Sequence, residues 1–208
     1  FMEAVKLGQR YEQRWPVDAI EPEISNKDTY AQEVWNALIE SAHASAEPGV
    51  LFWDTAKKNT PSDIYEDQGF GSVSTNPCGE IILSPYDSCR LMLVNLTSFV
   101  QNPWTQEAYF EWGKFANIVQ KAQRLMDDMI DLEIEQIDKI MDKIGRDPEP
   151  DDVKKTELKL WHKIRQAAGV VRRTGLGITG LGDALAMLGI KYGSDKSIET
   201  VEEIYKWL

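Results

Sequence analysis

The sequence predicts an α/β fold that is rich in helix. One observation is a long tract from Pro103 to Ile144 in which apolar residues recur at helical spacing. A second is a set of short, continuous apolar runs, such as residues 90–100, of the kind that form buried strands. A third is a glycine-rich run at 175–182 that leads into a further helical segment. Helices that alternate with short buried strands indicate an α/β protein.

The composition is that of a folded domain. The 208 residues are 42% hydrophobic and 27% charged, which is ordinary for a globular protein with a sizeable core. The formal net charge of −11 argues against a surface that grips nucleic-acid phosphates, so any nucleotide partner is expected to be a small one held in a pocket. No apolar segment approaches the roughly 20 residues that span a bilayer, and the N-terminus shows no signal-peptide pattern. We therefore expect a cytoplasmic protein that binds neither nucleic acid nor membrane.

The chain has two cysteines and two histidines. These numbers argue against a structural zinc site with four ligands. Acidic residues also gather on the predicted long helix, but they lack the Glu-x-x-His spacing of a carboxylate metal site and are interpreted as a solvated face. They are Asp127, Asp128, Glu133 and Glu135. We therefore expect no bound metal, and in a reducing compartment any disulfide between the cysteines would be transient and catalytic.

The first quarter of the chain predicts two helices and a strand. Residues 1–14 predict a helix entered partway, which suggests a segment of a larger or split protein, and Pro16 ends it. A second helix, capped by Asp28, extends to the Glu-Pro-Gly sequence that stops it. The apolar run at 50–53 predicts a buried strand, and the polar stretch at 54–71 predicts a long loop of the kind that is usually functional or mobile.

The stretch that follows carries a candidate site. In an extended segment side chains alternate between faces, so Asn76, Cys78 and Glu80 would project together while Pro77 and Gly79 shape the backbone between them. A thiol can act as nucleophile, redox group or hydrogen-atom abstractor, a carboxyl can exchange a proton, and an amide can orient a hydroxyl. A cysteine can also be a buried small apolar residue, but that role does not require these neighbours.

The second cysteine comes shortly after the first. Residues 81–83 predict a strand, 84–87 a turn that contains proline, and 90–100 a second buried strand. We therefore expect Cys89 at the mouth of one strand and Cys78 on the loop that leads to the other.

The second half of the chain predicts mainly helix. Thr105 is the expected cap of the tract that runs to Ile144, and we expect a break near 132–136 because an unbroken helix would be about 60 Å long. The remaining expected elements are a linker at 147–152, helices at 153–169, 183–188 and 197–208, and a glycine strand at 175–180.

Residues 175–180 also match G-x-G-x-x-G, the dinucleotide-binding fingerprint. That fingerprint needs an apolar strand immediately before its first glycine, and Arg172 and Arg173 stand there instead. A structural glycine strand is therefore favoured, with an oxidoreductase that binds a nicotinamide or flavin as the alternative.

Three motifs, taken together, point to a family. They read T-N-P-C-G-E-I at 75–81, S-P-Y-D-S-C at 84–89 followed by L-x-L-x-N-L, and R-R-T-G-L-G-I-T-G-L-G-D-A-L at 172–185. F-M-E-A-V at the start and E-P-G-V-L-F-W-D at 47–54 stand in the family's order and spacing. Over essentially its whole length the chain resembles the catalytic core of the large subunit of ribonucleotide reductases.

The resemblance implies a role for each candidate residue. Cys78 would carry a thiyl radical that abstracts the ribose 3′ hydrogen, and Glu80 would take the 3′-hydroxyl proton. Asn76 would hydrogen-bond the ribose, and Cys89 would be one of the two reducing thiols. The remaining substrate contacts would be Pro77, Gly79 and Ser88.

The resemblance also implies the fold. Residues 1–208 would form part of a ten-stranded α/β barrel with a central catalytic finger loop. The parts would be a helical entry at 1–46, strands and the catalytic loop at 47–100, a long helical tract at 103–146, and a helix, glycine strand and helices at 153–208.

The N-P-C-G-E form of the cysteine motif resembles the adenosylcobalamin-dependent class II. Adenosylcobalamin, a dithiol reductant such as thioredoxin, and ribonucleoside di- or triphosphate substrates are therefore implied. Nucleotide allosteric effectors would bind outside this segment, and the other reducing cysteine and the phosphate loop would lie in complementary segments of the same reductase. Homo-oligomerisation stays open. The alternatives are an iron-dependent class I segment and a non-catalytic interaction module derived from the reductase core.

Overall fold

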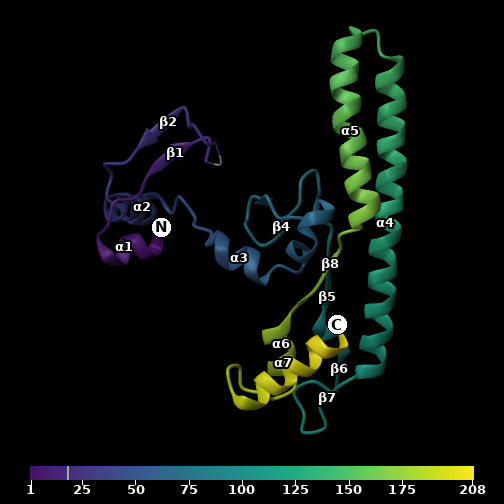
Figure 1. Cartoon of the computed structure of the whole chain (residues 1–208). Coiled ribbons are helices and arrows are strands. Elements are labelled where there is room, and N and C mark those ends of the chain that lie inside the picture. The colour runs from purple at the N-terminus through teal and green to yellow at the C-terminus, as the bar shows by residue number, and fades with distance from the viewer. Residues whose placement is uncertain (18) are drawn as a thin grey trace. The chain divides into compact units, whose positions relative to one another are not determined.

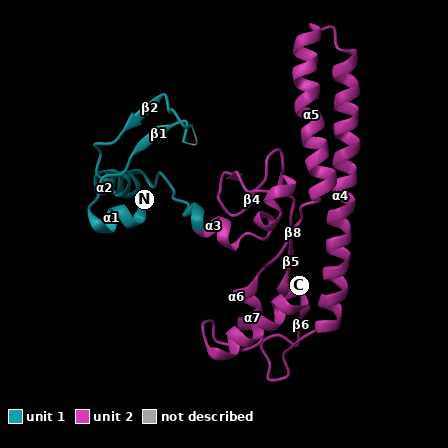
Figure 2. Ribbon diagram, viewed as in Figure 1, with its two compact units in different colours: residues 1–54 teal, residues 55–208 magenta. Residues whose placement is uncertain are grey.

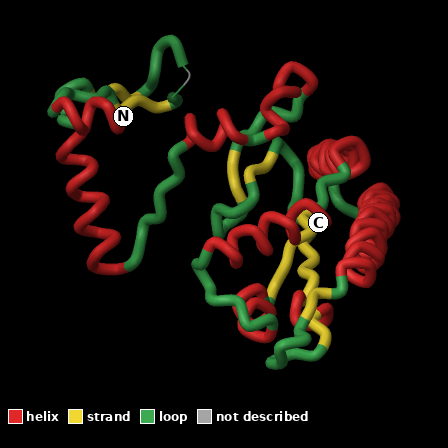
Figure 3. The backbone as a smooth tube through the Cα atoms, turned by 90° about the horizontal axis from the view of Figure 1, so that it is seen from below, coloured by secondary structure: helices red, strands yellow, loops and turns green. Residues whose placement is uncertain are grey.

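The computed structural model describes residues 1–17 and 19–208, which fall into two compact units, Phe1–Asp54 and Thr55–Leu208 (Figure 2). Helices make up most of the described chain, and the strands are short (Figure 3). The prediction of a helix-rich chain with a few short strands is therefore confirmed.

The first unit combines helices with a small antiparallel sheet. Its elements up to residue 45 are α1 (Met2–Leu7), β1 (Gln13–Trp15), β2 (Ile24–Asn26) and α2 (Ala31–Ser45). Ala31, at the start of α2, is fully buried. Gly8 ends α1 with φ +62°, a left-handed conformation that glycine adopts without a steric penalty.

Two sequence predictions for this unit are wrong. The helix predicted at 1–14 stops at Leu7, because Gly8 turns the chain and β1 then pairs with β2. Asp28 does not cap α2, whose N-cap is Tyr30; the Asp28 carboxylate instead accepts a hydrogen bond from Arg10 Nη1 at 2.8 Å. The second helix itself is confirmed, since α2 reaches Ser45.

The apolar run at 50–53 is not a strand. Val50, Leu51 and Phe52 are exposed, and Trp53 begins α3 (Trp53–Asn59). Within the described residues no strand pairs with this run, and a single unpaired strand would leave its backbone groups without hydrogen bonds. The predicted loop at 54–71 is likewise mostly helical, because the 3₁₀ helix η1 (Pro61–Gln68) follows α3.

The second unit holds three small sheets. β3 (Ser74–Thr75) pairs antiparallel with β4 (Ile82–Leu83), and β6 (Val100–Gln101) pairs antiparallel with β7 (Tyr109–Phe110). β5 (Leu91–Asn95) pairs in parallel with β8 (Gly175–Thr179), in the register Leu91↔Gly175. Counted over residues 1–17 and 19–208, the chain has four two-stranded sheets, so the described segment does not itself close a ten-stranded barrel.

The strand predicted at 90–100 is interrupted. It divides into β5, a 3₁₀ helix η2 (Leu96–Phe99) and β6. The break has a local cause, since Asn95 Oδ1 accepts hydrogen bonds from the backbone N–H and the hydroxyl of Thr97, at 3.1 and 2.9 Å. Asparagine side chains that bond the backbone two residues onward favour turns over extended strand.

Four helices complete the second unit. They are α4 (Trp112–Arg146), α5 (Asp151–Val171), α6 (Leu181–Met187) and α7 (Asp195–Trp207). α4 begins later than predicted, because β7 occupies residues 109–110, and it runs unbroken for 35 residues, about 50 Å. The break expected near 132–136 is therefore wrong. α4 and α5 lie side by side as an antiparallel pair (Figure 1), and Arg165 Nε on α5 donates to Asp138 Oδ1 on α4 at 2.6 Å.

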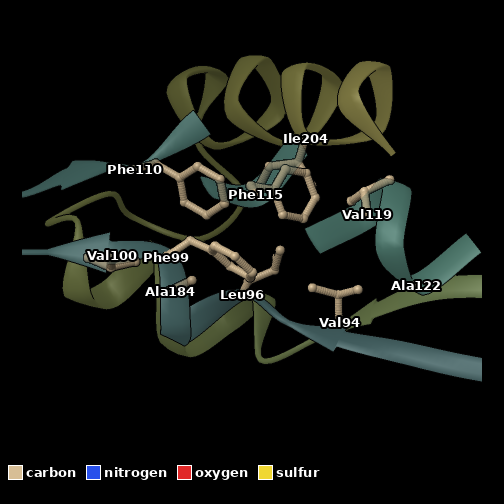
Figure 4. Close-up of a cluster of buried hydrophobic side chains, with 10 residues drawn as sticks. All are labelled: Val94, Leu96, Phe99, Val100, Phe110, Phe115, Val119, Ala122, Ala184 and Ile204. Carbon is tan, nitrogen blue, oxygen red and sulfur yellow. The ribbon is translucent and has the colours of Figure 1, made fainter. Parts of the chain in front are cut away.

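The hydrophobic core of the second unit gathers where β5, η2, β6 and β7 meet α4, α6 and α7 (Figure 4). Its centre is aromatic. Phe115 of α4 meets Phe99 and Phe110 edge-on, with ring centroids 5.2 and 5.4 Å apart. The buried members are Val94, Leu96, Phe99, Val100, Phe110, Phe115, Val119, Ala122, Ala184 and Ile204.

Gly180, between β8 and α6, is expected to tolerate no side chain. Its φ is +70°, and a Cβ there would lie 2.7 Å from Asn95 Oδ1, the atom that caps η2. Gly180→Ala should therefore lower the free energy of unfolding by about 2 kcal/mol, through left-handed strain and loss of that cap. Urea denaturation measures the change.

Gly182 provides the matched control for that substitution. It lies in α6, and a Cβ built there meets nothing within 4 Å. Gly182→Ala should leave stability unchanged or raise it by up to about 1 kcal/mol, because alanine has the higher helix propensity. Equal destabilisation by both substitutions would contradict the role assigned to the Gly180 backbone.

Candidate functional site

The first cysteine lies on a tight turn that joins β3 to β4. The Asn76 N–H donates to the Ile81 carbonyl at 3.2 Å, and Asn76 Oδ1 accepts from the Ile81 N–H at 2.9 Å. Inside this pair the Gly79 N–H donates to the Asn76 carbonyl at 3.0 Å, with φ of Gly79 at +81°. Glycine suits this position because it adopts a positive φ freely.

This turn corrects the predicted arrangement of the motif. Residues 76–80 are not extended, so Asn76, Cys78 and Glu80 do not alternate along one face of a strand. The flanking strands are only two residues long, and proline followed by cysteine and glycine closes the chain on itself. Cys78 is instead exposed near the tip of the turn, and Glu80 is exposed on its returning side.

A cavity of about 270 Å³ brings two of the candidate residues together. Glu80 and Cys89 both line it, the first from the β3–β4 turn and the second from the segment before β5. The other candidate residues do not line this cavity; they are Asn76, Pro77, Cys78, Gly79 and Ser88. The rest of the wall is formed by Asn59, Thr60, Pro61, Ile81, Ile82, Arg90, Leu91, Arg173, Thr174 and Gly175.

The cavity wall contains two arginines that the sequence analysis did not select. Arg90 follows Cys89 directly, and its Nε donates to Glu133 Oε2 on α4 at 2.5 Å. Arg173 precedes β8, and its Nε donates to Asp87 Oδ2 at 2.5 Å. The sequence contains one signal for Arg173. It belongs to the Arg-Arg pair at 172–173, which stands where a dinucleotide fingerprint would need apolar residues.

The two cysteines are free thiols in different settings. Cys78 is exposed, whereas Cys89 is half-buried on the cavity wall. An exposed thiol can react with an incoming group, and a half-buried thiol in a cavity can meet a ligand held there.

Within residues 1–17 and 19–208, no three side chains of the His, Cys, Asp and Glu types come together in a way that could hold a metal ion.

The glycines of β8 have a packing role. A Cβ at Gly175 would lie 2.6 Å from Leu91 Cδ2, and one at Gly177 would lie 3.0 Å from Leu93 Cδ2. The leucines of β5 thus lie over the glycines of the neighbouring strand. Because the first two fingerprint glycines lie inside the strand instead of after it, the geometry supports the structural interpretation over a dinucleotide site.

Next to Arg173, Arg172 joins the end of α5 to α4. It ends α5 with φ +45°, its Nε donates to Asp127 Oδ1 at 2.7 Å, and its Nη1 donates to Asp131 Oδ1 at 2.9 Å. The hydrogen bond from Arg172 is the chief cause that lowers the pKa of Asp127, against a smaller opposing effect of desolvation. The same contacts raise the pKa of Arg172.

The Arg172–Asp127 pair predicts a pH-dependent contribution to stability. A carboxyl whose pKa is lowered in the folded state stabilises the fold above its unfolded pKa, about 3.9, and this contribution is lost as pH falls through the folded pKa. The difference in urea midpoint between wild type and Arg172→Gln should therefore be largest at neutral pH and shrink below about pH 4. A difference that stays constant down to about pH 2 would contradict this assignment.

No helix in the described residues is both long enough and apolar enough to cross a membrane.

Comparison with known proteins places the chain in a family. Residues 4–208 match the family model of the ribonucleotide reductase barrel domain. A vitamin B12-dependent ribonucleoside-diphosphate reductase of Mycobacterium tuberculosis is 30% identical over 177 residues, which are 85% of this chain and 21% of that protein. The corresponding reductase of Thermoplasma acidophilum is 29% identical over 92% of this chain and 21% of its own length.

A third relative is a putative adenosylcobalamin-dependent ribonucleoside-triphosphate reductase of Mycobacterium phage D29, 39% identical over 41% of this chain and 10% of its own length. The chain thus spans about a fifth of the length of the relatives from Mycobacterium tuberculosis and Thermoplasma acidophilum. The family match confirms the resemblance drawn from the motifs at 75–81, 84–89 and 172–185, and the chain belongs to the ribonucleotide reductase barrel-domain family.

Proposed function

We propose that this chain supplies the radical cysteine and one reducing cysteine for the reduction of ribonucleotides to 2′-deoxyribonucleotides. The observation that carries the proposal is the cavity in which Glu80 and Cys89 meet, next to the turn that bears Cys78. Its volume of about 270 Å³ suits part of a nucleotide, such as the ribose, better than a whole one. The proposal extends to this chain the activity that its relatives are named for.

The proposed chemistry assigns one step to each group. A thiyl radical on Cys78 takes the 3′ hydrogen atom from the ribose, and Glu80 accepts the 3′-hydroxyl proton. The 2′-hydroxyl then leaves as water, and Cys89 with a second thiol supplies two electrons and becomes a disulfide. Cys78 finally returns its hydrogen atom to C3′, so the net change is ribonucleotide plus dithiol to deoxyribonucleotide, water and disulfide.

Asn76 is the proposed ribose ligand. Its Oδ1 is already bonded to the Ile81 N–H, so the Nδ2 amino group, with two donors, is the part available to a ribose hydroxyl. The same bond fixes the side-chain orientation. Pro77, Gly79 and Ser88 are proposed as further substrate contacts, the first two from the turn and Ser88 from the segment that carries Cys89.

Adenosylcobalamin is the proposed cofactor, because two of the relatives are named as vitamin B12-dependent and a third as adenosylcobalamin-dependent. One feature of this chain suits such a cofactor: the Cys78 thiol is exposed, so a radical formed outside the chain can reach it. When bound, the cofactor supplies that radical. The chain's own part is to present Cys78 on a turn closed by the Asn76–Ile81 hydrogen bonds.

The proposed reaction is tested with the reductase assembled from this chain and its complementary segments. Ribonucleoside di- and triphosphates are offered with dithiothreitol or thioredoxin, with and without adenosylcobalamin, and deoxyribonucleotides are measured by chromatography. Product that requires adenosylcobalamin supports the proposal. Product without it points to the iron-dependent class, and no product under any of these conditions contradicts the proposed activity.

A further inference from the structure

The segment that carries Cys89 is held by hydrogen bonds on both of its sides. On the N-terminal side the Asp87 side chain is 0% exposed, its Oδ1 accepts from the Ser88 N–H at 2.8 Å, and its Oδ2 accepts from Arg173 Nε. A buried carboxylate is costly unless it is paired and hydrogen-bonded, and both of these oxygens are. Residues 87 and 88 are therefore tied to the strand entry at Arg173.

On the C-terminal side Arg90 forms a wider set of contacts. Its side chain is 6% exposed, its Nε donates to Glu133 on α4, and its Nη1 donates to the carbonyls of Arg173 at 3.2 Å and, more weakly, Ser88 at 3.4 Å. The Arg90 carbonyl in turn accepts from the Gly175 N–H at 2.8 Å. One guanidinium thus connects α4, the entry to β8 and the residue before Cys89.

These contacts leave Cys89 little freedom. Of its two neighbours, Arg90 is bonded to α4 and to the residues before β8, and Ser88 is bonded to Arg90 and to Asp87, which pairs with Arg173. The planar fork of arginine fixes geometry in a way that lysine cannot. Thiol chemistry needs the sulfur to approach its partner within a narrow range of distance and direction. A loose segment would hold the Cys89 thiol in that position for only part of the time.

We propose that Arg90 and Arg173 are positioning residues that hold Cys89 on the cavity wall. The inference rests on the proposed function only in taking Cys89 to be a reducing thiol. Both arginines line the cavity with Cys89, and both bond to residues next to it in the chain or in space. Arg173 acts through the side chain of Asp87, and Arg90 acts through the carbonyls of Ser88 and Arg173.

Competitive alkylation tests the positioning directly. The purified protein is treated with iodoacetamide, and the labelling rates of Cys89 and of the exposed Cys78 are read by mass spectrometry as a ratio. Arg90→Gln should raise the Cys89/Cys78 ratio about tenfold, because local opening of the segment exposes the half-buried thiol. An unchanged ratio in a variant with a wild-type circular dichroism spectrum would overturn the proposal.

Arg165→Gln is the matched control. It removes an arginine that also joins two elements through a carboxylate, Asp138, but that pair ties α5 to α4 and includes no neighbour of Cys89. Its labelling ratio should stay within about twofold of wild type, since surface pairs contribute little and act locally. If Arg165→Gln raises the ratio as much as Arg90→Gln, general loosening explains the effect and the proposal is wrong.

A milder variant decides the question if Arg90→Gln does not fold. Asp87→Asn keeps one acceptor for the Ser88 N–H and removes the charge that faces Arg173. It should raise the Cys89/Cys78 labelling ratio severalfold. On a logarithmic scale this increase is about half of the increase expected for Arg90→Gln. A folded Asp87→Asn protein with the wild-type ratio would overturn the proposal.

Two activities of the assembled reductase distinguish the positioning of Cys89 from a purely structural role of Arg90. With Arg90→Gln, turnover should fall about tenfold while exchange of the substrate 3′ hydrogen, which depends on Cys78, stays within about twofold. Loss of both in equal measure contradicts positioning. If the wild-type reductase has no activity, the proposed function is contradicted but the positioning of Cys89 is not, because the alkylation ratio tests that positioning without any turnover.

Discussion

Cys78→Ser is expected to abolish ribonucleotide reduction by the assembled reductase, by a factor of about 10⁴ or more. The hydroxyl of serine holds its hydrogen much more strongly than a thiol does, so a serine cannot form and reform the radical that the proposed chemistry needs. The substitution removes no hydrogen bond that holds the turn, since Cys78 is exposed and the turn is closed by Asn76 and Ile81. The measurement is deoxyribonucleotide formed per enzyme, with circular dichroism as the check on folding.

Cys89→Ser is the contrasting variant for this experiment. It removes a thiol proposed to supply electrons and leaves the proposed radical residue intact. We expect exchange of the substrate 3′ hydrogen to continue and multiple turnover to stop, whereas Cys78→Ser should stop both. Full activity in the Cys78→Ser enzyme would show that the radical role assigned to Cys78 is wrong, and full turnover in the Cys89→Ser enzyme would do the same for the reducing role.

Phe115→Ala is expected to lower the free energy of unfolding of the second unit by about 3–5 kcal/mol. Phe115 is 0% exposed, and its ring contacts Phe99 and Phe110 edge-on in the core between the strands and α4. Truncation leaves a cavity and removes two aromatic contacts, and a loss of this size is a large part of the total stability of a typical domain. Urea denaturation followed by tryptophan fluorescence measures it.

Tyr109→Ala is the control for the core substitution. Tyr109 precedes Phe110 in β7, but its side chain points away from the core and is 54% exposed. Its truncation should change stability by no more than about 0.5 kcal/mol, because it removes little buried apolar surface. Similar losses in Phe115→Ala and Tyr109→Ala would argue that the aromatic cluster does not carry the stability of this unit.

Sequence reasoning predicted best where one face of a long helix is apolar. The buried residues Phe115, Val119, Met126, Ile130 and Ile137 recur at helical spacing, and α4 follows them. The break expected near 132–136 was wrong because it was inferred from helix length alone, whereas α5 packs alongside and supports a longer helix than one domain core needs. Neighbouring elements decide how far a periodic segment continues.

Short apolar runs were harder to predict. Residues 50–53 and 90–100 both suited a buried strand, but only part of the second became one, β5, because β8 pairs with it in parallel from a position more than 80 residues away. A run of this length is equally consistent with strand, helix or loop until a pairing partner is known. The alternation expected at 76–80 failed for a related reason, since the Asn76–Ile81 hydrogen bonds close a turn there.

By itself the sequence determined the family, the helix-rich composition, and the identities of the candidate residues, since spaced motifs carry that information without a fold. Only the tertiary structure decided that Glu80 and Cys89 share a cavity, that Cys78 is exposed on a turn, and that Arg90 and Arg173 hold the segment around Cys89. The reason is physical: the Arg90 contact to Glu133 and the Arg173 contact to Asp87 join residues 43 and 86 positions apart. No local pattern records contacts between residues that distant, so they exist only once the chain has folded.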